Sequence, residues 1–227
     1  MLFPFSASCR ALLRPGEAFA PAPPSLARAC WEMARVWMPL ALLNALGTAW
    51  RMGQAYELLR RGAVATGLFE RFGVDPSDLR AALASLPPAP AFGRIWPWLL
   101  LAVPLGVLGT WLHHAVWDHL GLWLLGGLKR KRGFRTSLLA EAQALRVAAL
   151  GTLLGLLGFV PVFGTLLALP LLLLDAYLWV FRGFALAARH DCEPWRGLAA
   201  TVVHAVLVSV CGLGLLGLTL FVARLAV

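Results

Sequence analysis

Residues 95–128 read IWPWLLLAVPLGVLGTWLHHAVWDHLGLWLLGGL, a run of 34 residues without Lys or Arg. The basic sequence KRKR follows at once at 129–132. A membrane-spanning helix needs about 20 mostly apolar residues, and Lys and Arg are enriched in the cytoplasmic loops beside such helices. This stretch therefore predicts a long or tilted membrane helix that ends at a cytoplasmic turn.

The composition of the whole chain also indicates a membrane protein. Of its 227 residues, 60% are hydrophobic and only 14% are charged, against roughly 25% charged in an average soluble domain. The net charge of +9 is interpreted as a topology signal rather than as nucleic-acid binding, because no basic and aromatic groove pattern is present. We expect an all-α polytopic transmembrane bundle that holds no cofactor and has the lipid bilayer as its first partner.

Charged and proline-rich segments separate the apolar runs and divide the chain. Residues 1–35 are expected to form a cytoplasmic proline-containing arm, and residues 36–227 a membrane domain with an external amphipathic loop at 53–94. The basic cluster at 129–135 and the loop 189–196 are predicted to lie on the same, cytoplasmic side, with the C-terminus outside. The five expected spans cover 36–52, 95–127, 136–160, 164–188 and 197–223.

A helix start is recognisable within the external loop. Asp75 followed by Pro76 is typical of an N-cap and first helical turn. Leu79, Leu83 and Leu86 then recur on one helix face. This pattern predicts a short amphipathic helix that lies on the membrane surface.

His114, Asp118 and His119 form the most prominent polar cluster within a predicted span. Residues four apart share a helix face, so His114 and Asp118 can hydrogen-bond each other, and His204 of the last span could approach them. Such a set can bind a metal ion or relay protons, although hydrogen bonding between neighbours is the simpler interpretation. Without an HExxH motif, the sequence does not support an intramembrane zinc protease.

Arg146 and Asp175 are ionisable residues inside the third and fourth predicted spans, as is Glu141. Charges inside a membrane are costly and usually pair. At about 1.5 Å per residue, Arg146 lies roughly 20 Å before the connection between these spans and Asp175 roughly 16 Å after it. We therefore expect a buried salt bridge between Arg146 and Asp175 that fixes the register of two antiparallel helices, with a transport or proton role as the alternative.

Residues 211–217, CGLGLLG, contain the spacing GxGxxG. No strand is expected before it and no acidic residue follows it, so it is not predicted to bind a dinucleotide. We expect its small residues, like Gly151 and Gly155 in the third span, to let helices approach closely. No nucleophile with an adjacent base is evident, so we predict neither an enzyme nor catalytic residues.

The last half of the chain carries an ordered series of motifs. They are HLGLWLLGG at 119–127, GFRT at 133–136, AQA at 142–144, the hinge 158–164 and RGF at 182–184. In order and spacing, these motifs resemble the YIP family of Ypt/Rab-GTPase-interacting membrane proteins (the Yip-one domain), especially its bacterial members. The positions that carry the resemblance are His119, Gly126, Gly127, Gly158, Pro161 and Gly164.

The resemblance implies a five-span helical domain with a cytoplasmic N-terminus and no enzymatic activity. Eukaryotic members bind Rab GTPases in vesicle traffic, a role that does not carry over to a bacterial chain. We expect a protein of the bacterial inner membrane that organises the membrane or binds a protein partner, with a homo-oligomer left open. The alternative is a small transporter or an ion- or proton-conducting subunit that uses Asp175, Arg146 and the set His114, Asp118 and His119.

Overall fold

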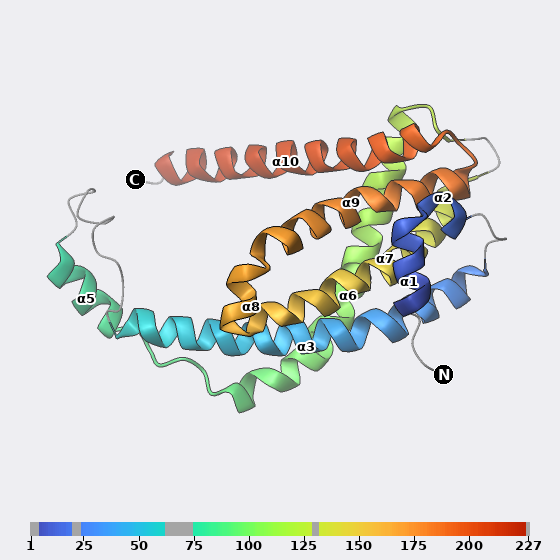
Figure 1. Ribbon diagram of the computed structural model, residues 1–227. Helices are drawn as coiled ribbons and strands as arrows, with labels where there is room; N and C mark the ends of the chain where they lie inside the picture. Colours follow the sequence, from blue (N-terminus) through green and yellow to red (C-terminus); the bar gives the residue numbers. More distant parts are fainter. Residues whose placement is uncertain (1–4, 20–23, 62–74, 129–131, 226–227) are drawn as a thin grey trace. The chain divides into compact units, whose positions relative to one another are not determined.

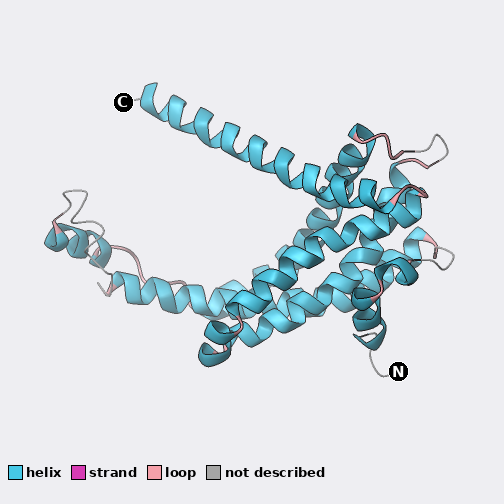
Figure 2. Ribbon diagram, turned by 45° about the horizontal axis from the view of Figure 1, so that its top comes forward, coloured by secondary structure: helices cyan, strands magenta, loops and turns pink. Residues whose placement is uncertain are grey.

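The computed structural model of the chain describes residues 5–19, 24–61, 75–128 and 132–225. Every regular element in these residues is a helix (Figures 1 and 2). The predicted all-α membrane bundle is therefore confirmed. Within the described residues, four helices are long and apolar enough to cross a membrane. They are α6 (Phe92–Leu124), α7 (Phe134–Gly155) with its following 3-10 turn, α9 (Ala168–His190) and α10 (Pro194–Leu225).

The predicted span 36–52 lies inside α3 (Leu26–Arg60), which is not among these four helices. Its uncharged core, Val36 to Trp50, has 15 residues, fewer than the about 20 that a crossing needs. The helix continues in both directions through charged residues, because helix formation tolerates Arg and Glu while burial in lipid does not. Four of the five predicted spans therefore match candidate spans in the structure.

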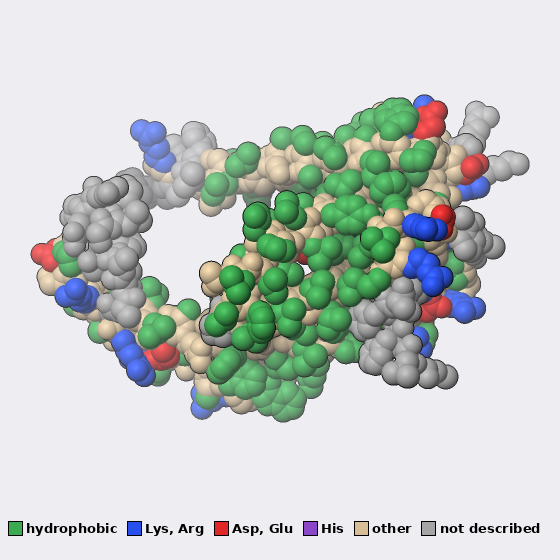
Figure 3. All heavy atoms as spheres, in the orientation of Figure 1, with side chains coloured by type: hydrophobic (Ala, Val, Ile, Leu, Met, Phe, Trp, Pro, Cys, Tyr) green, Lys and Arg blue, Asp and Glu red, His purple; other side chains and the backbone are tan. Residues whose placement is uncertain are grey.

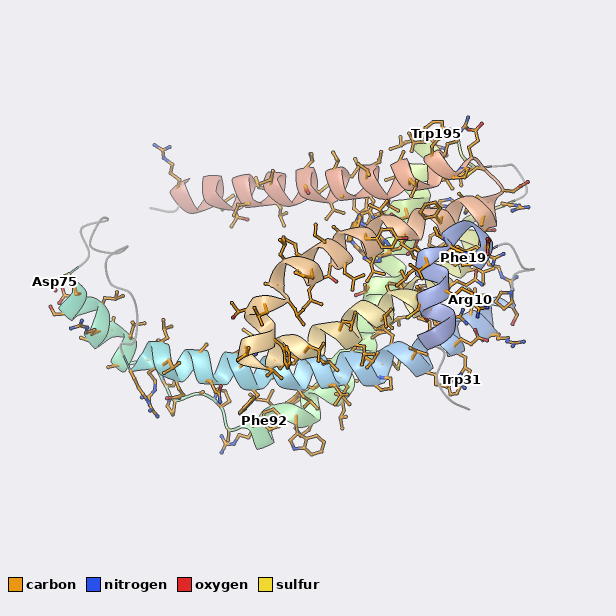
Figure 4. The ribbon with its side chains drawn as sticks, viewed as in Figure 1. Arg10, Phe19, Trp31, Asp75, Phe92 and Trp195 are labelled. Carbon is orange, nitrogen blue, oxygen red and sulfur yellow. The ribbon has the colours of Figure 1, made fainter. Side chains whose placement is uncertain are left out.

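The chain divides into two compact units. The larger unit combines residues 1–40 with 106–227, and the smaller unit comprises residues 41–105. Within the larger unit, the predicted arm 1–35 contains α1 (Phe5–Leu13) and α2 (Pro15–Ala18) ahead of α3. The Phe19 ring that follows α2 packs 5.5 Å from the ring of Phe181 on α9 (Figure 4). The arm thus contributes to a hydrophobic core rather than remaining an open chain.

In the larger unit, α9 packs against both α7 and α10. Small residues allow this approach: a Cβ added to Gly183 of α9 would lie only 2.6 Å from the carbonyl oxygen of Gly197 on α10. A Cβ on Gly151 of α7 would lie 2.5 Å from Cδ1 of Leu178 on α9, whereas Gly155 has open space around it. The predicted close approach is therefore confirmed at Gly151 and not at Gly155. Such small contact residues are typical of helix pairs in membranes.

Gly126 and Gly127 end α6 in a tight turn. Gly126 has a positive φ of 66°, a conformation that glycine adopts without steric cost. Its N–H donates to the carbonyl of Trp123, and the N–H of Gly127 donates to the carbonyl of Leu122. These are the two hydrogen bonds of a Schellman motif. Two of the family-type positions therefore have a direct structural role.

The predicted hinge between the third and fourth spans is also present. A 3-10 helix, η1 (Leu156–Phe159), is followed by the short α8 (Pro161–Leu166), so α9 begins only at Ala168 rather than at 164. A Cβ added to Gly164 would lie 2.6 Å from the carbonyl oxygen of Gly158. The two hinge glycines therefore let the chain fold back closely on itself.

In the smaller unit, α5 (Pro76–Ala84) is the predicted amphipathic helix (Figure 4). Asp75 caps it by accepting a hydrogen bond of 2.7 Å from the N–H of Ser77. The hydrogen bond from the Ser77 hydroxyl, followed by this backbone bond, lowers the pKa of the Asp75 carboxyl. Leu79 and Leu83 are half-buried and Leu86 is exposed. Residues 62–74 of the predicted loop 53–94 lie outside the described residues, whereas its two ends belong to α3 and α6.

The segment after α5 is held against α3 within this unit. Glu57 accepts a hydrogen bond of 2.8 Å from the N–H of Ala89, and the Tyr56 hydroxyl donates to the carbonyl of Pro87 at 2.7 Å. The Ala89 bond, followed by Arg60, lowers the pKa of the Glu57 carboxyl. An ionised Glu57 therefore favours this arrangement.

Candidate functional site

Arg182 is the centre of a buried charge cluster in the larger unit. It lies on α9 and is only 1% exposed. Its Nη1 atom is 3.4 Å from Oδ2 of Asp118 on α6 and 3.7 Å from Oε2 of Glu141 on α7. Both carboxylates are 0% exposed. One guanidinium thus faces two carboxylates from two different helices.

Histidines extend this cluster to α10. Nδ1 of His204 lies 2.6 Å from Oδ1 of Asp118, and Nε2 of His204 lies 3.3 Å from Nε2 of His113. His114 approaches the other carboxylate, with Nδ1 at 4.0 Å from Oε2 of Glu141. The predicted approach of His204 is confirmed. Asp118, however, bonds to His204 rather than to His114, its neighbour on α6.

Trp179 holds the guanidinium of Arg182 in place. The guanidinium carbon lies 4.2 Å from the centre of the Trp179 ring, in cation–π contact. Nε of Arg182 donates to the Trp179 carbonyl at 3.1 Å, and the indole N–H donates to the carbonyl of Thr201 on α10 at 3.1 Å. The orientation of Arg182 is therefore fixed by both α9 and α10.

Helix geometry explains why these side chains meet. His114 and Asp118 are one turn apart and share a face of α6. A Cβ added to Gly121 would lie 2.6 Å from the carbonyl oxygen of Ala200, so α6 and α10 approach closely one turn beyond Asp118. Gly183, next to Arg182, gives α9 the same freedom against α10. Small residues thus let α6 and α9 approach α10 closely at the level of the charge cluster.

His119 belongs to a separate polar group, because it lies about 100° further round α6 than Asp118. Its Nδ1 lies 2.8 Å from the hydroxyl of Ser137 on α7, which lies 2.9 Å from Nε2 of His190 on α9. The structure therefore divides the predicted metal candidates: His114 and Asp118 face the Arg182 cluster, whereas His119 faces Ser137. Within the described ranges, no group of three or more His, Cys, Asp or Glu side chains is arranged to hold a metal ion.

Arg146 has a different partner from the one expected. Its Nη1 lies 2.5 Å from Oε2 of Glu32 on α3, whereas Asp175 is exposed and lies beside Gly151. The structure therefore replaces the predicted pair of Arg146 and Asp175 with a pair of Arg146 and Glu32. Matched depth along two helices does not determine the direction in which a side chain points, and Arg146 points toward Glu32 on α3.

Two loops that were predicted to share the cytoplasmic side meet at one end of the larger unit. Nη1 of Arg196 donates to the Gly126 carbonyl at 2.7 Å, and Nη2 of Arg132 lies 3.8 Å from Oδ2 of Asp191. Arg132 also donates to the Arg189 carbonyl. Trp195 stands at this end, at the start of α10 (Figure 4). An open depression of about 420 Å³ is lined by Gly126, Gly127, Asp191, Cys192, Glu193 and Arg196; we call this surface the polar end face.

Sequence reasoning did not identify Arg182 as the centre of the buried cluster. Its neighbours Val180, Phe181 and Phe184 are apolar, and an arginine within such a run is costly unless acidic partners face it. The need for an acidic partner was therefore the available signal in the sequence, and Asp118 and Glu141 are the acidic residues inside the neighbouring spans. Whether either carboxylate would reach Arg182 depends on how each helix is rotated about its axis.

Comparison with protein-family models, with curated proteins and with solved structures gives no match for this chain.

Proposed function

We propose that this chain is a non-enzymatic integral membrane protein of the YIP type, which binds a partner protein through its polar end face and so organises the surrounding membrane. The observation that carries the proposal is the joining of two loops into one face. Arg196 and Gly126 bond across it, and Arg132 pairs with Asp191. A partner would meet a preformed surface rather than two separate loops.

The chemistry of the polar end face suits a polar or charged partner segment. The depression presents carboxylates and a guanidinium beside the backbone of two glycines. Trp195 beside it is 55% exposed, and exposed aromatic residues are frequent anchors in protein interfaces. In the YIP-type arrangement this face lies in the cytoplasm, where a soluble partner could reach it.

Site-specific photo-crosslinking in cells tests this proposal. A photoreactive residue at Trp195 or at the exposed Glu193 is expected to give discrete protein adducts. The matched control is Phe163 in α8, which is also exposed but belongs to the hinge at the other end of α7 and α9; it is expected to give none. Equal adducts at all three positions, or none at any, would contradict partner binding at this face.

A second candidate function, an ion- or proton-conducting subunit, is favoured by the buried charge cluster. Asp118 and Glu141, from two candidate spans, each lie within 4 Å of Arg182 on a third. Arg146 and Asp175 give this candidate no support as a pair. Proton flux into vesicles that contain the purified chain, lost in Glu141→Gln and kept in Asp175→Asn, would favour it over the scaffold.

A further inference from the structure

Glu141 is the least satisfied polar group of the buried cluster. Its side chain is fully buried, and neither of its carboxylate oxygens has a hydrogen-bond partner within the described part of the chain. The nearest cationic atoms are Nη1 of Arg182 at 3.7 Å and Nδ1 of His114 at 4.0 Å. Both distances exceed hydrogen-bond length. An ionised Glu141 would thus be buried with little direct compensation.

Asp118 is in a contrasting position. Its Oδ1 lies 2.6 Å from Nδ1 of His204. Its Oδ2 lies 3.4 Å from Nη1 of Arg182, closer than Oε2 of Glu141 at 3.7 Å. A hydrogen-bond donor and a nearby positive charge both favour the ionised form of a carboxyl group. Arg182 therefore has its counter-ion in Asp118, and Glu141 is the surplus acid.

Charge balance leads to the same conclusion. The side chains that face this space are His113, His114 and Asp118 from α6, Glu141 from α7, Arg182 from α9 and His204 from α10. With neutral histidines, two ionised carboxylates and one guanidinium would leave a net negative charge. A net charge inside a membrane is costly. One bound proton removes that charge.

We propose that the cluster is a proton-binding site, which holds one exchangeable proton on Glu141 while Asp118 stays ionised opposite Arg182. A protonated Glu141 also gains an O–H donor. An acceptor for it is available in Oδ2 of Asp118, which has no hydrogen-bond partner within the described residues and lies beside the same Nη1 atom of Arg182. A metal cation is disfavoured as the ligand, because the guanidinium already occupies the centre of the site.

This inference goes beyond partner binding and deepens the second candidate at the same cluster. Proton binding does not require conduction, so the site can exist in a scaffold as well as in a transporter. Its failure would leave the crosslinking result at the polar end face unchanged. Failed crosslinking would likewise leave the proton site unchanged.

Infrared spectroscopy of the purified full chain in lipid tests the site at neutral pH. The wild type is expected to show the carbonyl band of a buried carboxylic acid, shifted by exchange into D2O. Glu141→Gln should remove this band. Asp118→Asn should remove it too, because the remaining carboxyl would then ionise as the sole counter-ion of Arg182. Glu32→Gln is the matched control, since Glu32 is the acid of the Arg146 pair, and it should keep the band.

The wild type alone also decides the matter if a variant fails to fold. Its band should shrink as the pH is raised, with release of one proton per folded chain. A wild type without the band, or a band that remains in folded Glu141→Gln, overturns the proposal. A band lost in Glu141→Gln but kept in Asp118→Asn would overturn the assignment of Asp118 as the ionised counter-ion.

Discussion

The two halves of α10 differ in burial although both are apolar. In the first half Ala200, Thr201 and His204 are fully buried, whereas Leu213 and Leu215 in the second half are 69% and 68% exposed. Figure 3 shows hydrophobic side chains over the surfaces of α9 and α10. Lipid tails are as apolar as leucine, so hydrophobicity alone does not bring membrane helices together. Buried small and polar residues mark the first half, which we call the packed half. The second half, which we call the open half, exposes its apolar side chains.

Glycines make the same distinction. Gly121, Gly183 and Gly197 each have a neighbouring backbone where a Cβ would stand, whereas Gly212 and Gly214 have open space within 4 Å. The predicted close helix approach at 211–217 is therefore not found in the described chain. A small residue marks a helix contact only where a second helix is present. The open half suits contact with lipid, because its exposed side chains are apolar.

Removing Arg182 is expected to break the packed half most severely. Arg182→Met leaves Asp118 buried without its positive partner, and breaking a buried ion pair costs about 3–5 kcal/mol. Unfolding of the purified chain in mixed micelles measures this loss. Arg224→Met, at the exposed end of α10, is the control and should leave the free energy of unfolding unchanged. Equal stability of the two variants would mean that the cluster does not hold the helices.

A pair of glycine substitutions sharpens the comparison without changing charge. Gly183→Ala places a Cβ 2.6 Å from the Gly197 carbonyl oxygen, and overpacking of this kind costs about 1–3 kcal/mol. Gly214→Ala meets open space, so it should be neutral or stabilise α10 by up to about 1 kcal/mol. Thermal unfolding of both variants provides the measurement. Destabilisation by Gly214→Ala would indicate that the second half of α10 packs after all.

The pair of Arg146 and Glu32 should matter less than the buried cluster. Their side chains are 35% and 24% exposed, and partly exposed ion pairs contribute about 0.2–1 kcal/mol. We expect Arg146→Gln to lose an amount in that range and Asp175→Asn to change stability by less than about 0.5 kcal/mol. Denaturant unfolding compares the two variants. A larger loss in Asp175→Asn than in Arg146→Gln would restore the pairing that the sequence predicted.

The smallest expected effect concerns a carboxylate outside the candidate spans. The pKa of Glu57 is lowered in the folded chain by the Ala89 N–H, so its contribution is present above the unfolded pKa and is lost as the pH falls through the folded pKa. The protection factor of the Ala89 amide, which is its exchange rate corrected for the intrinsic effect of pH, should therefore fall on acidification. Glu57→Ala, which has no acceptor for this N–H, should show low protection at every pH. A protection factor that does not change with pH in the wild type would contradict this role of Glu57.

Local signals in the sequence predicted local structure well. Asp75 and Pro76 begin α5, Gly126 and Gly127 end α6, and the hinge around Gly158 folds back as expected. Each of these features depends on a few adjacent residues, so the chain itself carries the information. The same holds for the four long apolar helices.

The candidate site was only partly predictable, because it depends on helix rotation. His114 and Asp118 share a face of α6, but the choice of His204 over His114 as the partner of Asp118 comes from the position of α10. The partner of Arg146 depends in the same way on α3. Spacing along a helix gives depth and face, whereas the identity of the facing helix is a property of the whole bundle.

A double-mutant cycle between Asp118 and Arg182 tests most directly whether the buried cluster joins the helices. Asp118→Asn, Arg182→Gln and the double variant would be unfolded under the same conditions as the wild type. We predict that each single variant is destabilised and that the double variant recovers part of the loss, giving a coupling energy of about 1–3 kcal/mol. Losses that add to within about 0.5 kcal/mol would show that the two residues do not interact, and would contradict the account of the packed half.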